Sequence, residues 1–341
     1  MYNTAVIYVE IGENEEGQRL DRFLRKYLGA APLSFIYKAI RKDVKVNGKR
    51  ASQELVLAKG DRIDFYISEE ELDRLRNNSE RDRKESKAPN KKEFTTVYED
   101  DNIIIVNKPY GLLTHGDMVE KKHHLANQVV DDLIARGEYD PRESKGFTPA
   151  PANRLDRNTT GIVLFGKNAK ALRDLNRRIR RRDGIRKFYL TIAAGELDRR
   201  LELAGILKKN EEKNIVTVSE SHVADLEKGE REIITIAEPI KSSQGYSLIR
   251  VELVTGRSHQ IRAHLAEAGY PLIGDHKYGD KKVNSICSER FGIGSQLLHA
   301  YEIEFLQLED SPLNYLNKRF SAPLPKRFSQ IAKELFGDKY I

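Results

Sequence analysis

The first part of the chain alternates between apolar and polar positions in a way that predicts a small α+β segment. Apolar residues recur every three or four positions from Gln18 and again from Ser34, which is typical of two amphipathic helices. Alternation with a period of two predicts strands around them, and Asn47-Gly48 is a strong signal for a hairpin turn. The predicted strands cover residues 4–10, 44–46 and 62–67.

Apolar positions become scarce after residue 68. Residues 69–93 are mostly charged or polar, and such a segment buries too little apolar surface to offset its chain entropy. Only residues 69–77 are expected to form a helix. We therefore predict an N-terminal domain at 1–68, a charged flexible linker at 69–93 and a second domain at 94–341.

The second domain contains short β-branched runs separated by turn residues, which predict strands, and segments with helical spacing. Asn168 is expected to cap one helix, and Ser258 is expected to cap another that ends at Gly269. Residues 197–230 are polar and predict an irregular hairpin. Other strands are expected at 96–98, 103–106, 162–165, 187–192, 233–239, 246–254 and 297–305, and helices at 125–134 and 325–335.

Composition narrows the class of partner. The net charge is +7 and the pI is about 9.1, which suits a polyanion but does not choose between nucleic acid and an acidic membrane. No apolar run approaches the roughly 18 residues of a membrane span, and residues 1–12 lack the pattern of a secretory signal. Cys287 is the only cysteine, which fits a reducing cytosol and leads us to expect a cytoplasmic protein.

Basic residues gather in two places. In the N-terminal domain they lie off the apolar helix faces, and the second group extends from the helix after Asn168 into Arg186 and Lys187. Each group is either a solvated face, helped by the helix dipole, or a contact with a polyanion. As RNA-binding candidates we take Arg22, Lys38, Arg41 and Lys42 from the first group and Arg180 and Arg181 from the second.

The stretch 153–168 sets one carboxylate, Asp156, between Arg154 and Arg157, just before the apolar run 162–165. A loop held by a buried strand is a common place for catalytic residues, although a surface turn would have the same charge order. The chain has no phosphate-binding glycine motif, no acidic cluster and no nucleophile elbow. His259 and His264 are five residues apart, which is the wrong spacing for a zinc pair, so no metal is expected.

Several motifs together resemble a known family. They are R-L-D-R-N-T-T-G, R-K-F-Y-L-T, T-G-R-S-H-Q-I-R-A-H-L-A-E-A-G-Y-P-L-I-G-D and L-L-H-A, in this order. Over residues 94–310 the chain is similar to the RluA family of RNA pseudouridine synthases, and residues 18–68 resemble an S4-type RNA-binding domain. The resemblance implies an α+β fold with a mixed, mainly antiparallel central sheet flanked by helices and loops, preceded by the small S4-like domain.

The resemblance also implies roles for particular residues. Asp156 matches the catalytic aspartate, which begins the break of the uridine N1–C1′ bond by nucleophilic attack or by proton abstraction at the sugar. Arg257 matches the arginine that pairs with it, and Tyr189 matches the tyrosine that stacks on the uracil. Arg154 matches the arginine that fills the space of the flipped base, and Leu298 is expected to pack near the base.

The implied activity is isomerisation of uridine in large-subunit ribosomal RNA, within the RNA or a pre-ribosomal particle. Transfer RNA as the substrate, or a non-catalytic role in RNA binding or ribosome assembly, are the alternatives. Asn153 and Thr160 stand where most members have His and Ser, which bears on the target uridine. No cofactor, nucleotide or metal is expected, and by analogy the protein is expected to be a monomer without a membrane partner.

Overall fold

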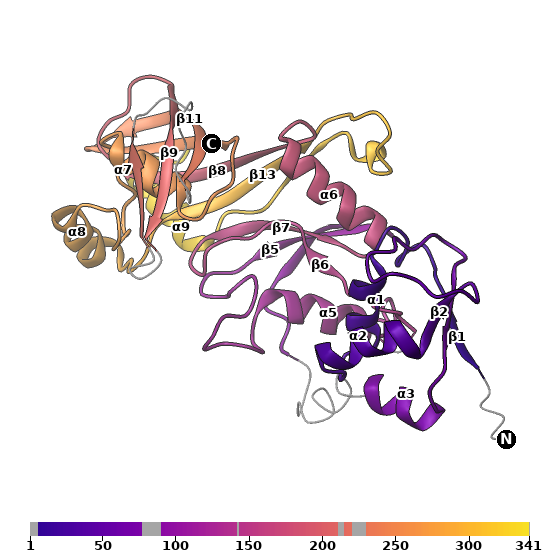
Figure 1. Ribbon diagram of the computed structural model, residues 1–341. Helices are drawn as coiled ribbons and strands as arrows, with labels where there is room; N and C mark the ends of the chain where they lie inside the picture. The colour runs from indigo at the N-terminus through magenta and orange to yellow at the C-terminus, as the bar shows by residue number, and fades with distance from the viewer. Residues whose placement is uncertain (1–5, 77–89, 142, 211–214, 220–229, 341) are drawn as a thin grey trace. The chain divides into compact units, whose positions relative to one another are not determined.

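The computed structural model describes residues 6–76, 90–141, 143–210, 215–219 and 230–340 (Figure 1). The chain divides into two compact units. The first comprises Met1–Lys92, Asn127–Ala150 and Gly166–Arg173, and the second comprises Glu93–Ala126, Pro151–Phe165 and Asp174–Ile341. The first unit therefore includes two segments that the sequence assigned to the second domain.

The N-terminal part of the first unit is an α+β module, as predicted. Three antiparallel strands form a sheet in the order β1-β3-β2. Phe23, Leu24, Ile36 and Ile40 are buried against it in one apolar cluster, because they lie on the predicted apolar faces of the two helices. The elements are β1 (Ile7–Glu10), α1 (Leu20–Tyr27), α2 (Leu33–Lys42), β2 (Val44–Val46) and β3 (Arg62–Phe65).

The helix predicted at the start of the charged segment is present as α3 (Glu69–Arg76). Leu72 and Leu75 are buried in the same apolar cluster as α1 and α2. This part of the predicted linker therefore belongs to the module, because two leucines three residues apart give the helix an apolar face. Residues 77–89 of the predicted linker lie outside the described residues.

Two later helices contribute to the first unit. In α5 (Leu125–Ala135), Asp131 accepts a hydrogen bond from the side chain of Asn90 at 2.8 Å. Asn168 caps α6 (Ala169–Arg181) as predicted, since its Oδ1 accepts the Ala171 N–H at 2.9 Å. The N–H of Ala169 donates to the side chain of Asn14 at 2.9 Å, which joins the start of α6 to the module.

The second unit contains a large mixed sheet with the strand order β10-β9-β11-β12-β8-β13-β7-β5-β4. Antiparallel pairs join β10 to β9, β9 to β11, β11 to β12, β12 to β8, β8 to β13 and β5 to β4, whereas β13 and β7 are parallel. The mixed, mainly antiparallel sheet is therefore confirmed. Two short strands add to it, since β14 pairs with β13 and β6 pairs with β7. The strands are β4 (Thr95–Glu99), β5 (Ile103–Lys108), β6 (Ala150–Pro151), β7 (Thr160–Gly166), β8 (Ile185–Ala194), β9 (Leu201–Asn210), β10 (Ile215–Ser219), β11 (Glu230–Ser243), β12 (Tyr246–Leu253), β13 (Leu298–Phe305) and β14 (Arg319–Ser321).

This unit also contains three helices and a short 3-10 turn, which are α7 (Gln260–Glu267), α8 (Lys281–Phe291), α9 (Lys326–Phe336) and the turn Asn314–Leu316.

The predicted cap at Ser258 is wrong. The residue before α7 is His259, whose backbone is left-handed with φ 57°, and its side chain does not cap the helix. Among the described residues, no helix combines the length and the apolar character needed to cross a bilayer.

One member of the arginine-rich group is structural. Arg178 is fully buried, with its Nε 2.9 Å from Asp174 and its Nη1 donating to the carbonyls of Gly184 and Leu306 at 3.1 and 2.8 Å. A guanidinium that is satisfied in this way cannot also reach an external polyanion. If this group contacts a polyanion, Arg178 therefore takes no part in that contact.

Candidate active site

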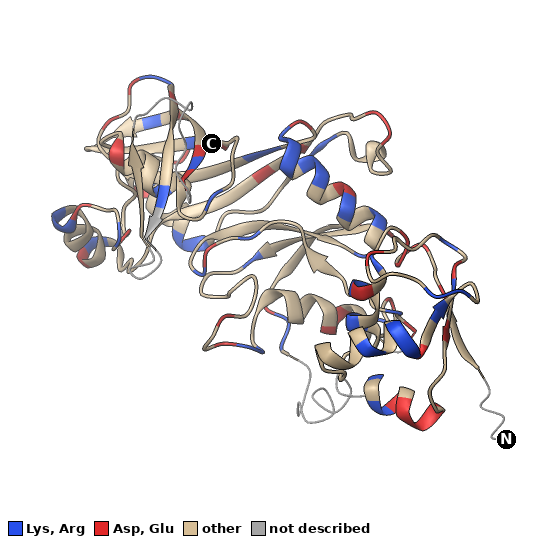
Figure 2. Cartoon of the chain, in the orientation of Figure 1, with Lys and Arg blue, Asp and Glu red and all other residues tan. Residues whose placement is uncertain are grey.

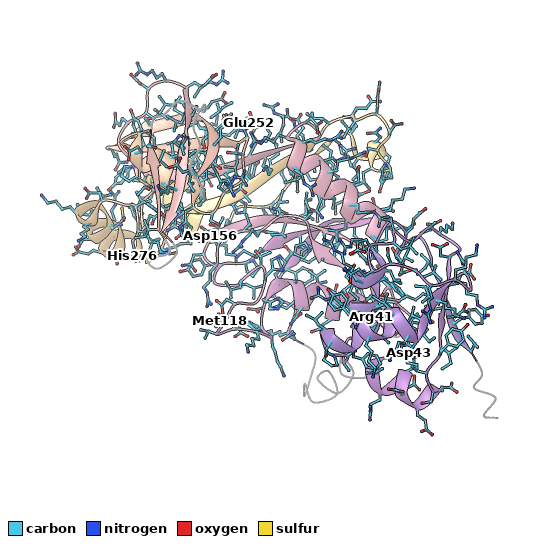
Figure 3. The ribbon with its side chains drawn as sticks, in the orientation of Figure 1. Arg41, Asp43, Met118, Asp156, Glu252 and His276 are labelled. Carbon is cyan, nitrogen blue, oxygen red and sulfur yellow. The ribbon has the colours of Figure 1, made fainter. Side chains whose placement is uncertain are left out.

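A cleft of about 290 Å³ lies in the second unit, where the loop before β7 meets the ends of several central strands. The predicted residues Asp156, Arg154, Tyr189, Arg257 and Leu298 all line it, although they are up to 144 positions apart in sequence. Figure 3 labels Asp156 in its place among the surrounding side chains. The cleft is also lined by Asn153, Lys187, Gly256, His259 and Arg262.

The backbone on both sides of Asp156 is held by side chains from β5 and the loop after it. Thr114 accepts the Leu155 N–H at 3.1 Å and donates its hydroxyl to the Leu155 carbonyl at 3.0 Å. The fully buried Lys108 donates to the carbonyl of Arg157 at 2.9 Å and to that of Leu112 at 2.7 Å. The position of Asp156 is therefore fixed by the fold itself.

Two further polar contacts join this loop to the sheet. The side chain of Asn153 binds the backbone of β7, because its Oδ1 accepts the Leu164 N–H at 2.8 Å. The hydroxyl of Thr160 lies 2.7 Å from Nδ1 of the fully buried His299 on β13. These contacts explain why a residue with hydrogen-bonding capacity is needed at Asn153 and Thr160, where the sequence departs from the common family pattern.

Asp156 shares an arginine with a second carboxylate. Nη1 of Arg262 lies 3.1 Å from Oδ2 of Asp156, and its Nε and Nη2 donate to Asp275 at 2.6 and 2.8 Å. Burial alone would raise the pKa of Asp275, but the hydrogen bonds from Arg262 hold that pKa below its ordinary value. Because Asp275 is fully buried and ionised, it fixes the guanidinium that faces Asp156.

The arginine that contacts Asp156 is thus Arg262, and the pairing predicted for Arg257 is wrong. Helix α7 begins at Gln260, so Arg262 lies in its first turn and is buried. Arg257 lies in the preceding turn with an exposed side chain, and its backbone N–H donates to the side chain of Gln260 at 3.1 Å. Both arginines lie within six residues of the same motif, and the motif does not show which of them reaches Asp156. Arg262 was therefore overlooked.

His259 adds a second contact near the carboxylate. Its Nε2 lies 3.8 Å from Oδ2 of Asp156, and its Nδ1 lies 2.9 Å from the hydroxyl of Tyr278. Burial lowers the pKa of His259, with the negative charge of Asp156 acting in the opposite direction. The left-handed backbone at this residue turns the imidazole toward the cleft, a feature that sequence spacing did not reveal.

Tyr189 is buried in the middle of β8, opposite Val251 of β12 and Ala300 of β13. Burial, and next the negative charge of Asp156, raise the pKa of its phenol well above the ordinary value, so the hydroxyl stays protonated. Leu298 is buried at the start of β13, whereas the side chain of Arg154 is exposed at the cleft. The cleft thus combines an aromatic ring, an apolar side chain and a carboxylate.

The other predicted RNA-binding cations do not line this cleft. Arg180 and Arg181 lie at the C-terminal end of α6, in the part of that helix that belongs to the second unit. In the first unit, Figure 2 colours the basic residues of α2 blue, and Figure 3 labels Arg41 on this helix. The exposed basic side chains of α1 and α2 that the sequence selected are Arg22, Lys38, Arg41 and Lys42.

The chain is similar to proteins of known activity. A family model described as RNA pseudouridylate synthase matches residues 102–267. Ribosomal large subunit pseudouridine synthase C of Haemophilus influenzae is 32% identical over 352 aligned residues, which cover 99% of this chain and 97% of that protein. The protein of the same name from Escherichia coli is 32% identical over 323 residues, covering 88% and 89% of the two chains.

Solved structures also resemble this one. Human RNA Pseudouridylate Synthase Domain Containing 4 superposes with a TM-score of 0.55 and 20% identity, covering 68% of this chain and 89% of that chain. Human RNA Pseudouridylate Synthase Domain Containing 1 gives a TM-score of 0.51 with 18% identity, covering 71% and 86%. At these identities the likeness demonstrates a common fold.

Proposed function

The chain belongs to the RNA pseudouridylate synthase family, and from that membership we propose that it converts specific uridines of large-subunit ribosomal RNA into pseudouridine. It is an RNA pseudouridine synthase, and its reaction is an isomerisation. The choice of ribosomal RNA rests on the relatives from Haemophilus influenzae and Escherichia coli, both named for the large ribosomal subunit. The observation that carries the proposal is the ion pair of Asp156 with Arg262 in a cleft that also contains Tyr189.

In the proposed reaction, Asp156 acts on the ribose of the target uridine. The N1–C1′ bond breaks, the uracil turns within the cleft, and C5 forms the new bond to C1′. The hydrogen on C5 then leaves as a proton, and N1 takes up a proton. Arg262 orients the carboxylate, since its Nη1 donates a charge-assisted hydrogen bond to Oδ2 of Asp156 at 3.1 Å. Every atom of the uridine is retained apart from proton exchange, so the proposal needs no nucleotide cofactor.

We further propose that the target base leaves its stack to enter the cleft, since an enzyme cannot reach these atoms inside a duplex. The ring of Tyr189 supplies a surface for the uracil, and Leu298 supplies an apolar neighbour. The exposed guanidinium of Arg154 is placed to occupy the space that the base vacates. These three residues keep the roles that the family resemblance implies.

The substrate class can be tested by mapping pseudouridines in ribosomal and transfer RNA from cells with and without the gene. We expect one or more sites in the large-subunit RNA to revert to uridine when the gene is deleted, and to return when it is restored. If pseudouridines are lost only from transfer RNA, the substrate is transfer RNA and the proposed reaction is unchanged. An unchanged pattern in both RNAs would contradict the enzyme function in the cell.

We also propose that the N-terminal module binds the RNA backbone through the exposed cations of α2. Replacing Lys38, Arg41 and Lys42 together by alanine should weaken RNA binding. The slope of log K against log salt should fall by up to about one for each phosphate that the variant no longer binds, because fewer counterions are released. The measurement is a filter-binding series at several salt concentrations.

A matched variant separates a specific surface from net charge alone. Lys49, Arg50 and Lys59 are exposed in the same module, so their joint replacement by alanine removes the same charge. We expect this variant to lose less affinity and less salt dependence than the α2 variant. Equal losses in the two variants would mean that α2 is not the RNA-binding surface.

A further inference from the structure

Lys187 occupies the cleft face of β8. Side chains alternate along a strand, so Lys187 and Tyr189 lie on one face and Arg186 lies on the other. Arg186 is already paired there, with Glu252 at 2.7 Å and Glu304 at 3.2 Å. Lys187 instead lines the same cleft as Asp156.

The ammonium of Lys187 has no hydrogen bond or ion pair with any residue in the part of the chain that the structure describes. Its side chain is half-buried, and burial, followed by the charge of Arg182, lowers its pKa to about 8. A β-carbon at Gly256 would lie 3.3 Å from Nζ, so the glycine leaves room for the amine beside the turn after β12. A partly buried cation without a partner is destabilising, and a bound anion would offset that cost.

The charges that line the cleft do not balance. Asp156 is the single carboxylate among its described lining residues, and it is already paired with Arg262. Three further cations line the cleft, and none of them has an ion pair within the cleft lining as described. They are Arg154, Lys187 and Arg257.

The substrate class supplies the missing charge. Uracil and ribose are neutral, whereas every uridine within an RNA chain is joined to a phosphate on each side. Resting on the function proposed above, we propose that Lys187, together with Arg257 of the same cleft lining, forms a subsite for a phosphodiester that adjoins the target uridine. The occupied subsite would hold the ribose against Asp156 and would give the Lys187 ammonium its partner.

A double-mutant cycle tests this subsite directly. One side of the cycle is Lys187→Met, which keeps the length of the side chain and removes the charge. The other is an RNA stem-loop in which a neutral methylphosphonate replaces the phosphate 5′ or 3′ to the target uridine. Dissociation constants and KM are measured for wild type and variant with each RNA, alongside the rate of product formation.

We expect wild type to bind one of the two methylphosphonate RNAs about tenfold more weakly, which corresponds to about 1.4 kcal/mol, because the modified RNA lacks the charge that the Lys187 ammonium would contact. Lys187→Met should show a similar loss with unmodified RNA and no further loss with that modified RNA. Its kcat should change much less than its KM. Lys187→Arg should recover most of the affinity, because it restores a cation at the same position.

Lys318→Met serves as the control, because Lys318 is exposed and lies outside the cleft lining. It should show the full methylphosphonate effect of wild type. If the loss of affinity caused by Lys187→Met and the loss caused by the methylphosphonate simply add at both phosphate positions, Lys187 contacts neither phosphate and the subsite is overturned. If Lys187→Met does not fold, as judged by its thermal unfolding, Lys187→Gln replaces it. Unchanged binding of both modified RNAs by wild type would overturn the proposal without any variant.

The same measurements keep the two proposals apart. Binding is measured independently of turnover, so coupling between Lys187 and one phosphate can be established whatever the rate of reaction. Product formation by wild type without coupling would reject the phosphate subsite and leave the proposed function intact. Absence of product from every RNA offered would count against the proposed function alone.

Discussion

Asp156→Ala is expected to abolish pseudouridine formation while RNA binding persists. Removing a catalytic nucleophile or base costs about 10⁴-fold or more in kcat in well-studied enzymes, and the proposed reaction cannot begin without this carboxylate. Its loss does not leave Arg262 unpaired, since Asp275 still accepts two hydrogen bonds from the guanidinium. The fold should therefore survive, and affinity for RNA should stay within about tenfold of wild type.

The measurement is single-turnover product formation together with filter binding on the same RNA. Asp183→Ala is the matched control, because Asp183 is exposed and lies outside the cleft lining. This control should keep the rate of wild type. Measurable turnover by Asp156→Ala would show that another residue begins the reaction.

Arg262→Lys should lower kcat by about 10²-fold or more and change KM far less, since positioned charge of this kind acts mainly on the transition state. Arg262 contacts two carboxylates with three different nitrogens, at 2.6, 2.8 and 3.1 Å. A lysine ammonium is a compact charge and cannot reproduce that planar arrangement. Asp156 would keep a cation nearby but lose the aligned donor, so the reacting carboxylate would be misplaced.

Arg250→Lys provides the control for this substitution. Arg250 is also paired with a carboxylate, Glu302 at 3.0 Å, but it lies outside the cleft lining. Both variants should unfold cooperatively, which thermal unfolding checks, and only Arg262→Lys should lose kcat. A normal kcat in a folded Arg262→Lys variant would contradict the role of the ion pair. Complete removal of Arg262 is a poorer test, because breaking a buried ion pair costs about 3–5 kcal/mol.

Periodicity predicted most of the elements because apolar faces determine how helices and strands pack. The sheet order could not be predicted in the same way. Strand β13 lies between β8 and β7, although more than a hundred residues separate it from either partner along the chain. Long-range pairing of this kind depends on the whole core and leaves no local signal.

The candidate site was predicted in part. The sequence placed Asp156 on a loop before a buried strand, and the structure agrees. Arg257 was matched to the family's arginine by its motif. Arg262 lies in the same motif, so the sequence could not show which of the two side chains reaches Asp156. The downstream Asp275 could have helped, since a carboxylate in an apolar setting requires a cation, but its burial is visible only in the fold.

The arginine-rich segment shows the same limit. By composition alone, Arg178, Arg186 and Lys187 were equivalent cations. In the structure the first is buried, the second is paired on one face of β8, and the third reaches the cleft from the other face. Strand alternation could have separated Arg186 from Lys187, but the burial of Arg178 depends on carbonyl groups that are distant in sequence.

The hydrogen bonds of Lys108 and Thr114 order the loop around Asp156 in the folded protein, before any RNA is bound. Both residues hold the peptide groups that flank Asp156, and both are buried. The loss of backbone entropy, about 1–2 kcal/mol for each residue, therefore occurs when the chain folds and not when RNA arrives. Less of the free energy of RNA binding is then needed to order the protein, and more of it is available for the proposed unstacking of the target uridine.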